Sequence, residues 1–164
     1  MSMTLISEQV LGSAVASVTF SSIPGTYTDL LLEIEAQNDW ASNNTQFAKL
    51  QYNSDTAANY SRTRVSGDGT SAASYGGANE TGHFVDGPTG NTATAMGLGF
   101  VHLLSYASTS VYKTALMRGS DALSFVIASA NLWRSTAAIT SILVLPGQGT
   151  VWKAGSTFRL WGVK

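Results

Sequence analysis

Residues 30–37 read Leu-Leu-Leu-Glu-Ile-Glu-Ala-Gln. A β-strand turns successive side chains to opposite faces, so Leu30, Leu32 and Ile34 would point one way. Glu33 and Glu35 would point the other way. This alternation predicts a strand that has one face in a hydrophobic core and the other on the surface.

The same period of two recurs along the chain, between turns that are rich in Gly, Pro, Asn and Asp. Strands are predicted at 14–20, 30–37, 48–52, 60–65, 95–105, 110–117, 123–130, 139–145 and 157–163. Residues 139–145 do not alternate but are nearly all apolar, so both faces of that strand are expected to be covered. The 3.6-residue period of a helix fits none of these segments well. We therefore expect an all-β fold of eight or nine strands in two antiparallel sheets, a jelly-roll-like β-sandwich. A closed eight-stranded barrel is the architectural alternative.

Glycine marks the least regular part of the sequence. Residues 66–92 hold seven glycines and Pro88, which predicts a long loop with at most a short strand around residues 83–85. The four residues 118–121, Arg-Gly-Ser-Asp, predict a further turn. The strands on either side of the long loop would lack partners alone, so we expect residues 13–164 to form a single domain.

Two alternatives remain open for residues 1–12. Met3, Leu5 and Ile6 precede the first confident strand, and an apolar terminal arm could reach a neighbouring protein. Residues 4–10 could equally form the first strand of the sandwich itself. The two alternatives differ in whether these side chains contribute to the domain's own stability.

Composition excludes several classes of function. The chain has 164 residues, of which 44% are hydrophobic and only 12% are charged, and its net charge is -1. The basic residues are scattered, so no clustered positive surface for nucleic acid is expected. Cysteine is absent, which excludes disulfides, thiol catalysis and thiolate metal sites. No signal peptide or membrane span is recognisable, so we expect synthesis in the cytoplasm and no membrane partner.

The residues that could carry chemistry form no convincing motif. His83 and His102 are isolated, and zinc would need further ligands beside them. The loops at 66–70 and 85–88 contain Asp-Gly pairs, which are ordinary in turns and lack the spaced acids of a calcium loop. No Gly-x-Ser-x-Gly elbow of a hydrolase is present.

Acidic residues in turns are the remaining catalytic candidates. Two carboxyl groups at a suitable separation could act as a glycosidase pair. The candidates are Asp39, Asp55, Asp68, Glu80 and Asp86. Acidic residues in turns are also what any β-protein contains, so we expect no enzymatic activity, no metal and no cofactor.

Four tryptophans differ in their surroundings. Trp133 and Trp152 flank the most apolar segment, residues 139–145, and are expected in the core or at its edge. Trp40 lies in a polar loop, where it would serve as an exposed contact for a protein or a sugar, or as a buried anchor of the loop.

Four stretches recur together in a known family. They are 27–32 (Tyr-Thr-Asp-Leu-Leu-Leu), 50–55 (Leu-Gln-Tyr-Asn-Ser-Asp) with Asn59-Tyr60, 133–142 (Trp-Arg-Ser-Thr-Ala-Ala-Ile-Thr-Ser-Ile) and 154–164 (Ala-Gly-Ser-Thr-Phe-Arg-Leu-Trp-Gly-Val-Lys). In this order and spacing they resemble a family of tailed-phage virion proteins. The resemblance spans about residues 15–164.

The resemblance implies a role in the virion and brings no catalytic residues, because the family includes capsid decoration proteins and tail or fibre components. We favour a capsid decoration (cement) protein, made in the host cytoplasm, that binds the major capsid protein and stabilises the shell as a homotrimer. The alternative is a tail or tail-fibre component with a carbohydrate- or receptor-binding sandwich. The candidate interface residues are Met3, Leu5, Ile6, Trp40, Tyr75 and Phe84, of which the last three are the candidates for stacking on a sugar.

Overall fold

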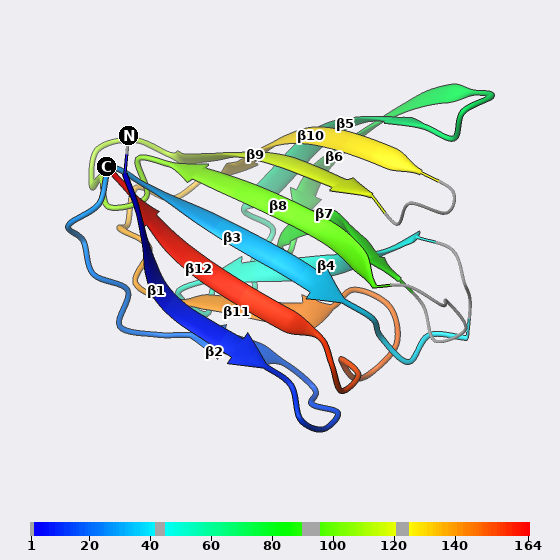
Figure 1. Cartoon of the computed structure of the whole chain (residues 1–164). Helices are drawn as coiled ribbons and strands as arrows, with labels where there is room; N and C mark the ends of the chain where they lie inside the picture. Colours follow the sequence, from blue (N-terminus) through cyan, green and yellow to red (C-terminus); the bar gives the residue numbers. More distant parts are fainter. Residues whose placement is uncertain (1, 42–44, 90–95, 121–124) are drawn as a thin grey trace.

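The chain folds into two antiparallel sheets packed face to face, which confirms the predicted β-sandwich (Figure 1). The computed structural model describes residues 2–41, 45–89, 96–120 and 125–164. In order across the sheet, the eight strands of the large sheet are β1 (Met3–Val10), β12 (Thr157–Val163), β3 (Asp29–Ala36), β8 (Gly97–Leu104), β9 (Lys113–Ser120), β10 (Val126–Trp133), β5 (Tyr60–Gly67) and β6 (Ala72–Glu80). The four strands of the small sheet are β2 (Val18–Phe20), β11 (Ile142–Pro146), β4 (Thr45–Tyr52) and β7 (His83–Thr89).

The core lies between the two sheets. Leu30, Leu32 and Ile34 of β3 are fully buried there, as the alternation of residues 30–37 predicts, and Glu33 lies on the opposite face. Trp133 and Trp152 are also buried, as expected of core residues. The described part of the chain contains no helix that is long and apolar enough to cross a membrane.

The glycine-rich segment is not the long loop that the sequence predicts. It contains two strands, β6 and β7, which pair with β5 and β4. Glycine is needed because β7 of the small sheet approaches the backbone of β8 and β9 closely. A Cβ atom at Gly87 of β7 would overlap the carbonyl oxygen of Leu98, and one at Gly119 of β9 would overlap that of Asp86. These glycines therefore mark close approach of two backbones rather than a flexible loop.

Two other boundaries differ from the prediction. Strand β9 continues through Arg118, Gly119 and Ser120, where a turn was expected, because all three pair with β8 and β10. The first confident strand, residues 14–20, is reduced to the short β2 and an isolated bridge between Val15 and Trp152. Asp121 lies outside the described residues.

The N-terminal residues form an edge strand and not an arm. Strand β1 pairs with β12, with Leu5 opposite Trp161, and the side chain of Ile6 packs against the core. The alternative with a strand over residues 4–10 is therefore the one that the fold contains. The backbones of Ser2 and Lys164 exchange two hydrogen bonds, of 2.9 and 3.0 Å, so the two ends lie side by side (Figure 1).

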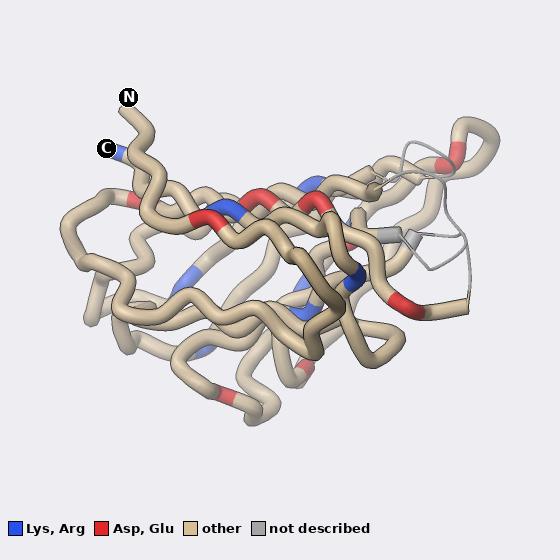
Figure 2. The backbone as a smooth tube through the Cα atoms, turned by 60° about the horizontal axis from the view of Figure 1, so that its bottom comes forward, with Lys and Arg blue, Asp and Glu red and all other residues tan. Residues whose placement is uncertain are grey.

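Charged residues are spread along the backbone and form no large cluster of one sign among the described residues (Figure 2). This agrees with the scattered positions of the basic residues in the sequence.

Candidate functional site

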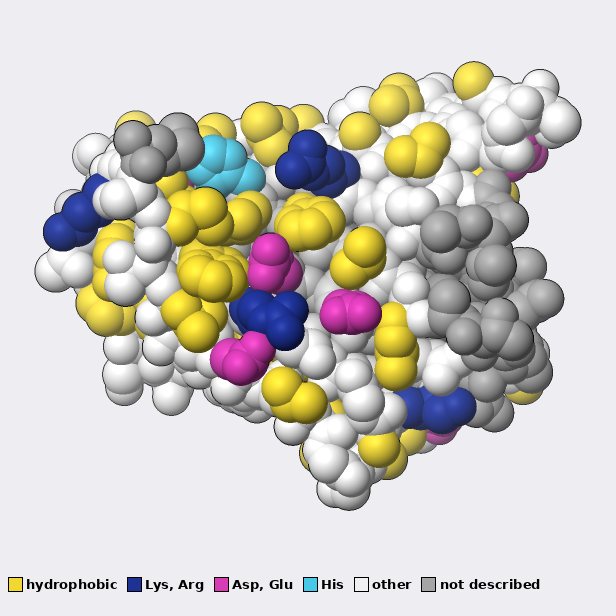
Figure 3. Space-filling view, viewed as in Figure 1, with side chains coloured by type: hydrophobic (Ala, Val, Ile, Leu, Met, Phe, Trp, Pro, Cys, Tyr) yellow, Lys and Arg dark blue, Asp and Glu magenta, His cyan; other side chains and the backbone are white. Residues whose placement is uncertain are grey.

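The outer face of the large sheet is unusually apolar for a surface. Leu116 is 52% exposed, Val65 is 58% exposed and Val126 is 63% exposed, and all three lie on this face. Hydrophobic side chains gather over it around a histidine and a few charged groups (Figure 3). Contiguous exposed apolar surface of this kind is typical of an interaction site.

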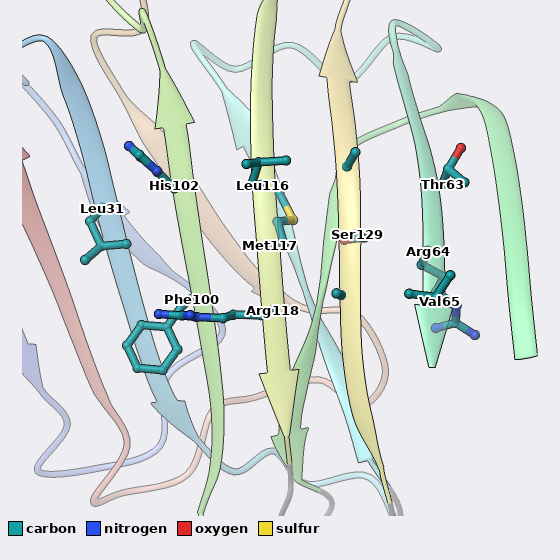
Figure 4. Close-up of a pocket in the computed structure, with 12 residues that line it drawn as sticks. Leu31, Thr63, Arg64, Val65, Phe100, His102, Leu116, Met117, Arg118 and Ser129 are labelled. Atoms are coloured by element: carbon teal, nitrogen blue, oxygen red, sulfur yellow. The ribbon is translucent and has the colours of Figure 1, made fainter. Parts of the chain in front are cut away.

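A trough runs along β10 on this face. Its floor is made of small side chains, Ala128 and Ala130, while the longer Leu116 of β9 forms one wall and Val65 of β5 forms the other. The trough has a volume of about 590 Å³ (Figure 4). The hollow therefore arises because a strand with small outward residues lies between two strands with larger ones.

The electrostatic character of the trough is set by one wall. The Arg118 guanidinium lies over the Phe100 ring, 5.4 Å from its centre, and His102 Nε2 lies 3.2 Å from a carboxylate oxygen of Asp29. None of the described residues that line the trough is acidic. The site can therefore bury an apolar side chain and pair with a carboxylate.

The interface residues expected from the sequence do not gather in one place. Met3 and Leu5 are exposed on the edge strand β1, whereas Ile6 is partly buried against the core. Trp40 is 46% exposed and lies beside Gly149 in a different loop. The N-terminal candidates and Trp40 therefore lie at separate places on the molecule.

Tyr75 and Phe84 belong to one cluster, but not to an open aromatic platform. The Arg62 guanidinium lies over both rings, 5.0 Å from the centre of Tyr75 and 4.6 Å from that of Phe84. Phe84 also packs edge-on against Phe47. Arg62 therefore lies against both rings, and Tyr75 is still 46% exposed.

Ion pairs hold this cluster to the rest of the molecule. Arg62 Nε lies 3.2 Å from Glu80 Oε1, and Arg64 donates a 2.7 Å hydrogen bond to Asp86 Oδ1. Burial raises the pKa of Asp86, and the two arginines offset this only in part. The cluster joins the β5–β6 hairpin to β7, so its role is structural.

His83 is a core residue and not a loop residue. It is fully buried on β7, and its Nδ1 lies 2.8 Å from the hydroxyl oxygen of Tyr52. Burial lowers its pKa to about 3, so the ring is neutral. Lys113 is buried as well, and its Nζ donates to the carbonyl oxygens of Val111 and Thr136. Within the described ranges, no three His, Asp or Glu side chains gather as metal ligands.

The stretches behind the family resemblance contact one another. Asp55 Oδ2 accepts hydrogen bonds from Trp133 Nε1 at 2.7 Å and from Asn59 at 3.0 Å. Asn53 Oδ1 accepts hydrogen bonds from the backbone N–H groups of Thr140 and Ser141, which precede β11. Residues 50–60 are thereby fixed to residues 133–142.

The other two stretches meet in the large sheet. The Tyr27 ring lies where a side chain at position 162 would stand, so only Gly162 leaves room for it. Trp161 Nε1 donates a 3.0 Å hydrogen bond to Glu33. These contacts hold the C-terminal strand against β3 and the residues before it.

Comparison with family models, with curated proteins and with solved structures finds no match for this chain.

Proposed function

We propose that this chain is a structural protein of a tailed-phage virion, and that it decorates the capsid as a homotrimer bound to the major capsid protein. The observation that carries the proposal is the distribution of exposed apolar side chains. They occur on the outer face of the large sheet, on the edge strand β1 and in the loop before β9, where Val111 and Tyr112 are exposed.

This distribution suits a subunit with neighbours on several sides. A ligand-binding protein usually concentrates its apolar surface in one cleft with a few converging polar groups. A shell component instead contacts both its own copies and other proteins, each through a separate patch. The low share of charged residues, 12%, supports the same interpretation.

The edge strand β1 is the proposed contact with the capsid. Its backbone has a free edge, since β12 pairs with one side only, and Met3 and Leu5 are exposed beside it. An exposed edge strand can add to a neighbour's sheet or pack its side chains against another surface.

Copy number per particle tests the virion role. The protein should be present in hundreds of copies in purified particles, as measured by quantitative mass spectrometry against the major capsid protein. A few copies per particle would support the tail alternative, and absence from particles would refute the proposal.

Co-sedimentation with preassembled capsids tests the role of β1. The double variant Met3→Ser, Leu5→Ser should bind capsids more weakly while it keeps its melting temperature, because both side chains are exposed. Val111→Ser, which removes an apolar side chain of similar exposure from the loop before β9, is the matched control. Undiminished binding of the double variant would exclude β1 as the contact.

A further inference from the structure

The outer face of the large sheet is built in rows that cross its strands. The pairing of β12, β3, β8, β9 and β10 aligns one row at the level of Leu31 and the next at the level of Glu33. The Leu31 row consists of Trp161, Leu31, His102, Leu116 and Ala130. The Glu33 row consists of Arg159, Glu33, Phe100, Arg118 and Ala128. Strand β8 is the centre of both rows.

Glu33 and Arg118 occupy equivalent places on the two sides of this centre. Each is paired directly opposite Phe100, one from β3 and the other from β9. The ion pairs among the described residues include neither of them. Glu33 accepts a hydrogen bond from Trp161, and Arg118 lies over the Phe100 ring. Each therefore has a neighbour in its own sheet, but no oppositely charged one among these ion pairs. A carboxylate and a guanidinium thus lie on one exposed face, separated by one strand.

We infer that this face binds a second copy of the chain, about a two-fold axis that runs parallel to β8. Such an axis places β3 of one copy over β9 of the other at the same level. Glu33 then lies opposite Arg118 of the second copy, and the same pair forms again on the other side of the axis. Two-fold contacts are self-complementary in this way, and they are the commonest contacts in homo-oligomers.

The shapes of the two halves also match. The same axis places Trp161 over Ala130 and Arg159 over Ala128, so the long side chains of β12 face the floor of the trough. Leu31 lies opposite Leu116, which covers the exposed leucine with another apolar side chain. The long side chains of Trp161 and Arg159 thus lie opposite alanines, and Leu31 lies opposite another leucine. This is the complementarity that packing of two aligned sheets requires.

Charge reversal tests the contact, with the molecular mass in solution as the readout. The mass should be measured by light scattering at about 100 μM, where even a contact with a Kd on the order of 10 μM is populated. Arg118→Glu should halve the mass of the wild-type species, and so should Glu33→Lys. The double variant that carries both changes should recover the full mass, because the two charges are exchanged.

Two further variants separate this contact from a general effect. Ala130→Phe fills the trough without altering a charge, and it should also halve the mass. Thr19→Glu places a charge on the exposed face of β2 in the small sheet and should leave the mass unchanged. Circular dichroism and the melting temperature show whether each variant is folded.

The inference does not rest on the proposed function. The mass should halve whether the wild-type species is a dimer or a pair of trimers. It is overturned if the wild-type protein is a monomer at this concentration, if Arg118→Glu leaves the mass unchanged, or if the double variant does not recover it. Loss of capsid binding in Arg118→Glu without a change of mass would show that another protein occupies the face instead.

Discussion

Asp55 joins two parts of the chain through one carboxylate. It accepts hydrogen bonds from Trp133 and Asn59 and from the backbone N–H of Ala57. These bonds lower its pKa although burial alone would raise it. A single acidic residue thus fixes the turn after β4 to the end of β10.

We expect Asp55→Ala to reduce the free energy of unfolding by about 2 to 3 kcal/mol, because it leaves the indole N–H of Trp133 without an acceptor. Urea denaturation measures the change. Asp68→Ala is the control, since Asp68 bonds only within its own exposed turn, to Thr70 and Ser71. Comparable losses in both variants would contradict a linking role for Asp55.

His83 makes stability depend on pH. In the unfolded chain its pKa is near 6.5, whereas burial lowers it to about 3 in the folded protein. As the pH falls below 6.5, only the unfolded state gains the proton, and it is therefore favoured. Stability should decrease by up to about 1.4 kcal/mol per pH unit from this one group.

We predict that His83→Gln flattens this dependence between pH 7 and 5, as measured by denaturant unfolding at each pH. His102→Gln, which removes the other histidine from the outer face of the large sheet, is the comparison variant. Identical slopes for the wild type and His83→Gln would refute the assignment.

At the scale of the elements, the distance between the sheets is set where β7 crosses β8 and β9. Only glycine fits there, because a larger residue at position 119 would meet the backbone of Asp86. We expect Gly119→Ala to destabilise the fold by about 3 kcal/mol or to prevent folding. Gly76→Ala, at a position with open space around it, should leave the melting temperature unchanged. Equal melting temperatures for Gly119→Ala and Gly76→Ala would mean that the two sheets can move apart at position 119 without loss of stability.

Strand β1 should contribute to stability as well as to contacts. Deletion of residues 1–11 removes the partner of β12 and the packing of Ile6 on the core, so calorimetry should show a clearly lower melting temperature. The side chains of Met3 and Leu5 are exposed and should not contribute to this loss of stability. The double variant Met3→Ser, Leu5→Ser is therefore the control. An unchanged melting temperature after the deletion would mean that β1 behaves as an arm after all.

The strands differ in how far local sequence could predict them. Alternation at residues 30–37 identifies β3 because the polarity of each side chain indicates which face of the sheet it lies on. The segment 72–80 has no such pattern, since Gly76 and Gly77 carry no side chain, and it becomes a strand only by pairing with β5. The sequence alone does not distinguish a glycine that permits the close approach of two backbones from a glycine that makes a turn.

The same limit applies to the candidate site at the scale of the whole molecule. The sequence named Met3, Leu5 and Trp40 as candidate contacts and left open whether Trp40 is exposed or a buried anchor of its loop; all three side chains are exposed. It did not identify the trough, whose floor and walls come from β10, β9 and β5. The outward alanines at 128 and 130 are the only local signal, and they become a hollow only after the strands are ordered.

The first and last described residues lie next to each other in the fold. Because Ser2 and Lys164 bond to each other's backbone, a linker of a few residues could join them without strain. The chain could then be opened elsewhere, for instance at Gly69 in the exposed tip between β5 and β6. A circular permutant of this kind should fold to the same sandwich, and a peptide fused at the new ends would project from the opposite side of the molecule.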